Sequence, residues 1–284
     1  MSFIGKIGKS FVFSTELGGI NGTEIDDSIA KAREYKGLDA INVHDCPNAR
    51  LRMNSVMAAA ILQRELNITT VPHFTCRDRS LLGTQADLLG AHGLGIRALL
   101  PTTGDGPQHG PYPSKAVYDY NSVKLMEIIR GLNGGKDAIG EEIKGKTSFA
   151  IGATANPGAV NLETEIGNMT KKVEAGADFF QTQPVYDVEQ ALAFLASARR
   201  LGKPILLGIM PLKSLKMAEF VNKNVAGVTV PDAILAELSQ GKTGFEVAGE
   251  LIQKVRKEVD GLHIFGMGDV AVTNRLVEFT RGLG

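Results

Sequence analysis

The sequence predicts a single (β/α)8 barrel that spans residues 1–284, and three observations favour this fold. Eight short, mostly apolar segments alternate with amphipathic segments from one end of the chain to the other. The chain has 284 residues, a length at which such a barrel forms one domain. The competing fold, a doubly wound open sheet, normally carries a glycine fingerprint after its first strand. Residues 18–22 read GGING, which does not fit G-x-G-x-x-G.

The strands are expected where short apolar segments are bounded by Gly, Pro or Asn. Continuous apolar segments of this length are typical of strands that are buried on both faces, as in a parallel sheet covered by helices. The eight expected strands cover residues 11–17, 40–45, 69–76, 97–104, 148–155, 179–185, 204–210 and 262–267.

Helical periodicity fills the gaps between these strands. Apolar residues recur with the spacing i, i+3, i+4, i+7 from Met53 to Ile61 and again from Val188 to Ala198. Gly134 and Gly135 follow another periodic segment, where they would end a helix. Helices are therefore expected over residues 117–132, 160–176 and 186–201, with two or three more in 212–260, broken near Pro231 and Gly241.

The composition excludes several classes of protein. Lys and Arg number 31 and so do Asp and Glu, so the basic excess of a nucleic-acid-binding protein is absent. No apolar stretch reaches the roughly 18 residues of a membrane span, and the first ten residues lack a signal peptide, so we expect a cytoplasmic protein. Residues 140–147 match the phosphate-loop pattern, but a strand follows them instead of preceding them, which argues against nucleotide binding.

Polar residues at the C-terminal ends of the strands are the candidates for chemistry, because barrel active sites lie there. Glu16 ends the first strand; burial would raise its pKa and suit it to general acid catalysis, and a salt bridge to Lys or Arg is the equally weighted alternative. Asp105 follows Gly104 and is either a second acid or a turn-forming residue. Gln183 carries an amide in an apolar strand, which a ligand such as a pterin would satisfy.

No metal site is expected. His44, Asp45, Cys46, His73 and Cys76 lie near strand ends, but no pair among them has a zinc-type spacing, and two reduced thiols are the simpler interpretation of the cysteines. The residues therefore predict a barrel with two acids and a glutamine, suited to proton transfer to an organic ligand.

Several motifs, in a fixed order and spacing, resemble those of methylenetetrahydrofolate reductases, especially the bacterial form fused to homocysteine methyltransferase domains. The resemblance runs from about residue 11 to about residue 265. It rests on residues 15–17 (TEL), 72–79 (PHFTCRDR), 89–92 (LGAH), 95–97 (GIR), 103–105 (TGD), 117–122 (VYDYNS), 171–177 (KKVEAGA), 182–183 (TQ) and 208–211 (GIMP).

The resemblance implies a flavoprotein of one-carbon metabolism and methionine biosynthesis. Its expected activity is hydride transfer from reduced FAD to the methylene carbon of 5,10-methylenetetrahydrofolate, which gives 5-methyltetrahydrofolate. Glu16 occupies the position of the acid that protonates N10 of the folate, and Asp105 that of the acid beside the flavin. Gln183 matches a folate-binding glutamine, and Leu215 stands at the position whose side chain stacks on the substrate. The implied cofactor-binding residues are His44, His73, Thr103, Gly104, Asp105, Gly152, Asn156, Asn168, Lys171 and Lys172.

Departures from the family pattern keep other functions open. Thr103 replaces an Arg, Leu215 replaces a Phe that stacks on nicotinamide and folate, and Gly152 lies where an aromatic residue is usual. Electrons are therefore expected from NAD(P)H or from a partner subunit, and family analogy implies a homo- or hetero-oligomer. One alternative is a folate-binding subunit without redox chemistry that docks an electron carrier or a corrinoid methyltransferase. Another is a flavin-free, nicotinamide-dependent reductase.

Overall fold

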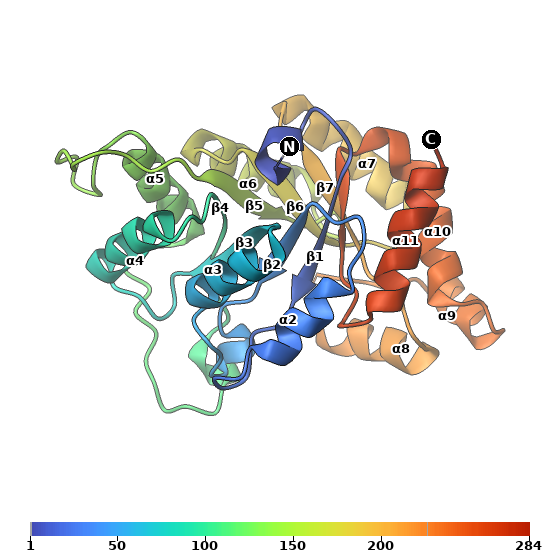
Figure 1. Ribbon diagram of the computed structural model, residues 1–284. Helices are drawn as coiled ribbons and strands as arrows, with labels where there is room; N and C mark the ends of the chain where they lie inside the picture. The colour runs from blue at the N-terminus through green and yellow to red at the C-terminus, as the bar shows by residue number, and fades with distance from the viewer. Residues whose placement is uncertain (1, 226) are drawn as a thin grey trace.

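Eight parallel strands close into a barrel in the computed structural model, which describes residues 2–225 and 227–284 (Figure 1). The strands are β1 (Val12–Leu17), β2 (Ala40–Val43), β3 (Thr69–Thr75), β4 (Ala98–Thr102), β5 (Ala150–Ala155), β6 (Phe179–Pro184), β7 (Ile205–Ile209) and β8 (Gly261–Ile264). β1 pairs with β8 as well as with β2, and this pairing closes the barrel. The (β/α)8 fold expected from the sequence is confirmed. Seven expected segments contain one strand each, and the eighth, 262–267, overlaps β8, which begins one residue earlier at Gly261.

Helices surround the barrel (Figure 1). They are α1 (Phe3–Lys6), α2 (Asp26–Arg33), α3 (Ser55–Leu66), α4 (Leu81–Gly93), α5 (Ser122–Asn133), α6 (Leu162–Ala175), α7 (Val188–Ala198), α8 (Leu215–Asn224), α9 (Asp232–Ser239), α10 (Gly244–Val255) and α11 (Val270–Gly282), with short 3-10 turns at Pro47–Ala49, Pro107–His109, Arg199–Leu201 and Arg256–Glu258. The three helices α8 to α10 confirm the expectation for residues 212–260. None of the described helices is long and apolar enough to cross a membrane.

The helix expected over residues 117–132 is wrong at its start. It begins at Ser122 because the side chain of Asn121 accepts a hydrogen bond from the Lys124 N–H and caps it. Periodicity did not identify α4, because Leu82 and Leu89 are exposed on its outer face and blur the apolar stripe.

The barrel interior is layered, because every second residue of a strand points inward. The layer at the N-terminal ends of the strands is apolar, and Phe3 of α1 packs against it. Its strand residues are Val12, Ala40, Val71, Ala98, Leu100, Phe179 and Leu206. The next layer is polar, with Ser14, Asn42, His73, Gln181 and His263 joined by hydrogen bonds. The third layer opens at the C-terminal mouth. The polarity of the interior therefore rises toward the end where barrel enzymes do their chemistry.

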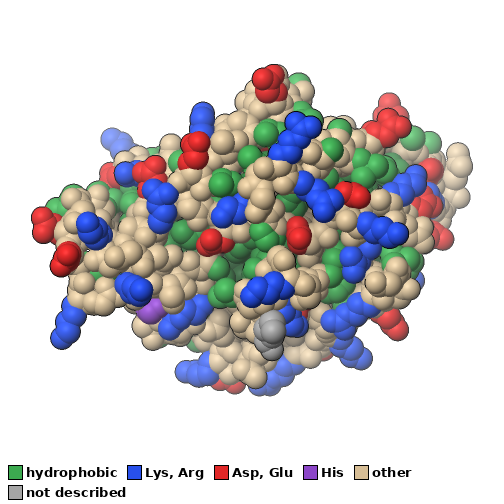
Figure 2. All heavy atoms as spheres, turned by 90° about the horizontal axis from the view of Figure 1, so that it is seen from above, with side chains coloured by type: hydrophobic (Ala, Val, Ile, Leu, Met, Phe, Trp, Pro, Cys, Tyr) green, Lys and Arg blue, Asp and Glu red, His purple; other side chains and the backbone are tan. Residues whose placement is uncertain are grey.

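Both signs of charge occur on the face of the molecule that is seen from above in Figure 2. Seen from above, Lys and Arg side chains are interspersed with Asp and Glu side chains (Figure 2). This face therefore presents no single-sign field that would attract a polyanion.

Candidate active site

A cavity of about 440 Å³ occupies the C-terminal mouth of the barrel, within the size range of small-molecule sites. Its lining comes from six strands, β1, β3, β4, β5, β6 and β8, and from the segments that follow β2, β4 and β8. The lining residues are Glu16, His44, Asp45, Pro47, His73, Thr75, Leu100, Thr102, Gly104, Asp105, Thr154, Gln181, Thr182, Gln183, His263 and Phe265. Five residues expected at the site, Glu16, His44, His73, Asp105 and Gln183, therefore lie together, as does Gly104.

Glu16 is bonded to a histidine. Its Oε2 lies 2.8 Å from Nε2 of His44, and the two side chains are 11% and 22% exposed. Burial raises the pKa of the Glu16 carboxyl, but the charge and hydrogen bond of His44, with smaller effects of His263 and His73, hold it below its usual 4.5. The expectation of a raised pKa is wrong, and so is the expectation of a Lys or Arg partner.

The pKa of His44 moves in the opposite direction. Burial lowers it, but the charge of Glu16, the hydrogen bond between them and the charge of Asp105 raise it above the usual 6.5. Both shifts favour the same state, a carboxylate beside an imidazolium.

Two further histidines beneath this pair are neutral. Burial is the main cause that lowers the pKa of His73 to about 3 and that of His263 to about 4. Nε2 of His73 lies 3.1 Å from the amide nitrogen of Asn42, which can only donate, so this ring nitrogen accepts. Nδ1 of His263 lies 2.9 Å from Oγ of Ser14. His263 was not expected from the sequence; its two-residue spacing from Gly261 on β8 and from Phe265 just after this strand is the pattern that identifies it.

Asp105 projects from the turn after β4. Its Oδ2 accepts a hydrogen bond of 2.6 Å from the backbone N–H of Asn48, which ties the turn to the segment after β2. Gly104 has a φ of +90°, and a Cβ there would lie 3.0 Å from the Cβ of Thr75, so this turn requires glycine. Thr103 is exposed and its hydroxyl lies 3.4 Å from that of Ser122, outside the cavity lining; the inward residue on β4 is Thr102.

The residues expected to hold the cofactor phosphates lie on and near α6. Nζ of Lys172 donates a 2.6 Å hydrogen bond to the carbonyl of Thr154, a cavity residue, and burial lowers the pKa of this ammonium. Asn168 and Lys171 are exposed on the same helix. The side-chain oxygen of Asn156 accepts from the N–H of Gly158. Of these residues, Lys172 has a hydrogen bond to a residue of the cavity lining.

Gly152 and Leu215 are not part of the mouth lining. A Cβ at Gly152 would lie 2.8 Å from the ring of Phe179 and 3.0 Å from Leu100, so the barrel core already fills that space. Leu215 begins α8 and lines a separate cavity with Lys213, Phe245 and Asp269. Phe265 supplies a phenyl ring to the described lining of the mouth, and this residue was not expected from the sequence.

The family model of methylenetetrahydrofolate reductase matches residues 10–279. Among curated proteins, a probable methylenetetrahydrofolate reductase (NADPH) of Caenorhabditis elegans is 25% identical over 207 residues, which cover 72% of this chain and 28% of that protein. Methylenetetrahydrofolate reductase 1 of Schizosaccharomyces pombe is 25% identical over 235 residues, which cover 77% of this chain and 36% of that protein. The chain thus spans about a third of the length of these relatives.

Solved structures share the fold. An uncharacterized protein from Clostridium thermocellum, described as binding two copies of 5-methyl-5,6,7,8-tetrahydrofolic acid, superposes with a TM-score of 0.65 at 12% identity and 97% coverage of both chains. Dihydropteroate synthase from Thermus thermophilus superposes with a TM-score of 0.52 at 14% identity, covering 97% of this chain and 95% of that one.

Proposed function

Since the chain belongs to the methylenetetrahydrofolate reductase family, we propose that its barrel mouth reduces 5,10-methylenetetrahydrofolate to 5-methyltetrahydrofolate. The observation that carries the proposal is that Glu16 and Gln183 line one cavity from different strands. The reaction needs a proton at N10 of the folate, and the pterin needs a partner with both donors and acceptors. A carboxyl group and an amide meet these two needs.

Gln183 is available to a ligand. Its neighbour on the same face of β6, Gln181, is buried and bonds to Asn42 and Ser14. The side-chain amide of Gln183 has no hydrogen-bond partner among the residues that the structure describes, although it lines the cavity. A pterin edge would satisfy this amide, which gives Gln183 the binding role and leaves Glu16 free for proton transfer.

The cofactor proposed for this site is a flavin, and the residues present fit it. The bare backbone of Gly104 on one side of the mouth and the ring of Phe265 on the other leave room for a flat ring. The ammonium of Lys172 beside Thr154 supplies positive charge for a diphosphate, and Asn168 lies one turn away on α6. When bound, the reduced flavin supplies the hydride; NAD(P)H or a partner subunit reduces it.

Two carboxylates of the chain then have different roles in the reaction. Glu16 protonates N10, which opens the five-membered ring of the folate to an iminium cation. Asp105, fixed by the N–H of Asn48, places a negative charge at the mouth that stabilises this cation. Asp45 is held by Arg79 at 2.6 Å, so Glu16 and Asp105 are the carboxylates of the cavity that are open to substrate. The rings of His73 and His263 are uncharged and do not neutralise them.

The experiment that tests the proposal is a flavin spectrum followed by a half-reaction. The purified protein should absorb light at about 450 nm, as proteins with a bound oxidised flavin do. After anaerobic reduction, methylenetetrahydrofolate should reoxidise it and 5-methyltetrahydrofolate should form. A colourless protein that oxidises NAD(P)H with the folate would be the flavin-free reductase, and folate binding without turnover would indicate a binding subunit.

Replacing Lys172 by Ala is expected to weaken flavin binding roughly tenfold or more, because the diphosphate loses a charge-assisted contact in a partly buried site. Equilibrium titration of the apoprotein with FAD measures the effect, and a melting curve confirms that the variant is folded. The control is Lys254→Ala, since Lys254 is exposed on α10 and has no part in the cofactor site. Full flavin affinity in Lys172→Ala would remove this lysine from the cofactor site.

A further inference from the structure

The proposed reaction raises the question of where the proton for N10 resides. Glu16 is held as a carboxylate by the imidazole of His44 at 2.8 Å. A carboxylate cannot donate a proton, so the group that carries the proton must be found next to it. The net reaction also consumes one proton in each turnover, so that group must be reloaded from water.

The surroundings of Glu16 leave His44 for this task. His263 of β8 lies 3.9 Å from the same oxygen, and its Nδ1 is held by Ser14 and Gln181. Nε2 of His73 on β3 accepts from Asn42. His263 is buried, and the pKa values of both rings are lowered, so both are uncharged. Asp45 of β2 is bonded to Arg79 and Thr75, and Asp105, after β4, is a further anion facing His44. Tyr35, near Thr15, is a phenol whose pKa burial raises.

We propose that Glu16 and His44 act as one acid with a single proton, which rests on Nε2 of His44 and reaches the folate through the Glu16 carboxyl. This inference rests on the proposed function for its substrate. His44 acts through Glu16 and not on the folate, so it is a positioning residue that holds the proton in place.

The transfer balances in two steps. The Nε2–H bond of His44 breaks as an O–H bond forms on Oε2 of Glu16, which leaves a neutral imidazole and a neutral carboxyl group. That O–H bond then breaks as the N10–H bond forms, which restores the Glu16 carboxylate. Water reprotonates His44, whose side chain is 22% exposed at the rim of the mouth, twice the fraction of Glu16. The pair keeps an acid available at a higher pH than a lone carboxyl would.

The first test observes the pair without substrate. In the purified protein, the ring signals of His44 are followed by NMR against pH. We expect the His44 pKa above its usual 6.5, because the carboxylate of Glu16 outweighs the effect of burial. In Glu16→Gln the His44 pKa should fall, since burial remains and the larger of its two counter-charges is gone, with Asp105 left. A His44 pKa that is the same in both proteins would overturn the inference.

The second test uses the pH profile of the folate half-reaction. In His44→Gln the proton can reside only on Glu16, so the rate should fall at a pH at least one unit lower than in the wild type. The rates of the two proteins should therefore be equal at about pH 5 and differ about tenfold or more at pH 8, because each pH unit by which the midpoint moves changes the rate by a factor of ten. His92→Gln, which changes a histidine of α4 that is bonded to Ser148 and lies outside the cavity lining, is the control and should leave the midpoint in place.

The outcomes separate this inference from the proposed function. A loss of rate in His44→Gln that is equal at every pH would assign His44 a structural role and overturn the inference, although the reductase activity would stand. Coupled titration of Glu16 and His44 in a protein that does not reduce the folate would support the pair and contradict the proposed substrate.

Discussion

Replacing Glu16 by Gln is expected to slow reoxidation of the reduced protein by methylenetetrahydrofolate by roughly 10²–10⁴-fold, the usual effect of losing a general acid. Glutamine keeps the shape of the side chain but cannot pass a proton to N10. Reduction of the flavin by its electron donor does not need this proton and should survive. Stopped-flow measurement of the two half-reactions separates the two effects.

The control for this substitution is Glu24→Gln, which changes an exposed carboxylate in the segment after β1 and should leave both half-reactions unchanged. Folate should still bind to Glu16→Gln, because the pterin contact is assigned to Gln183 on β6. If both half-reactions slowed equally and the melting temperature fell, Glu16 would be a structural partner of His44. Normal reoxidation would exclude Glu16 as the acid.

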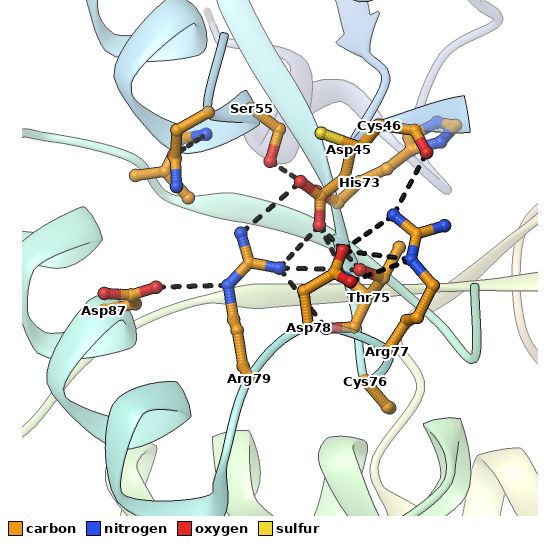
Figure 3. Close-up of polar contacts among 12 residues, drawn as sticks. Asp45, Cys46, Ser55, His73, Thr75, Cys76, Arg77, Asp78, Arg79 and Asp87 are labelled. Atoms are coloured by element: carbon orange, nitrogen blue, oxygen red, sulfur yellow. Dashed lines mark hydrogen bonds and ion pairs between the residues drawn. The ribbon is translucent and has the colours of Figure 1, made fainter. Parts of the chain in front are cut away.

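Replacing Asp45 by Ala is expected to lower the free energy of unfolding by about 3–5 kcal/mol, the range for breaking a buried ion pair from one side. Asp45 is 6% exposed, and its Oδ2 accepts from Arg79 at 2.6 Å and from the N–H and hydroxyl of Thr75 at 3.0 and 2.9 Å (Figure 3). These bonds tie the end of β2 to the end of β3. Among the residues that the structure describes, Arg79 would then keep Asp87 as its one ionic partner. Denaturant unfolding measures the loss.

The same carboxylate makes the stability depend on pH. Burial raises the pKa of Asp45, but the charge and hydrogen bond of Arg79, with those of Thr75, hold it below its usual 3.8. A group whose pKa is lowered by folding stabilises the protein above its unfolded pKa and loses this contribution as the pH falls through the folded value. Wild type and Asp45→Ala should therefore approach each other in stability below about pH 4.

The matched control is Glu127→Ala, which removes an exposed ion pair with Lys124 and should cost less than about 1 kcal/mol. A similar small loss for Asp45→Ala would mean that the end of β2 is held by the strand pairing alone.

The sequence predicted the barrel and its strands because both depend on short-range patterns. Apolar segments of strand length recur eight times, and each coincides with a strand in the structure to within a few residues. Glycine and asparagine mark many of the helix ends, as at Gly134 and Asn161. The helix start at Ser122 was missed, since the apolar spacing continues into residues 117–121 and only the cap at Asn121 ends it.

The candidate site was predictable to the extent that it depends on position along a strand. Glu16, Asp105 and Gln183 follow from the rule that chemistry lies at the C-terminal ends of barrel strands, and the structure brings them to one cavity. The alternation of side chains along β4 and β8 could have identified Thr102, His263 and Phe265. It also explains why Thr103 lies outside the cavity.

The sequence by itself determined the fold and the chemical types of the side chains at the mouth. Only the tertiary structure decided their protonation. Glu16 and His44 are 28 residues apart, and neither residue's neighbours in the chain indicate that their side chains meet at 2.8 Å. Burial alone would raise the pKa of Glu16, as the sequence suggested, but a neighbouring imidazole reverses that shift. The charge of a buried group depends on which groups surround it in space, and that is fixed only when the barrel closes.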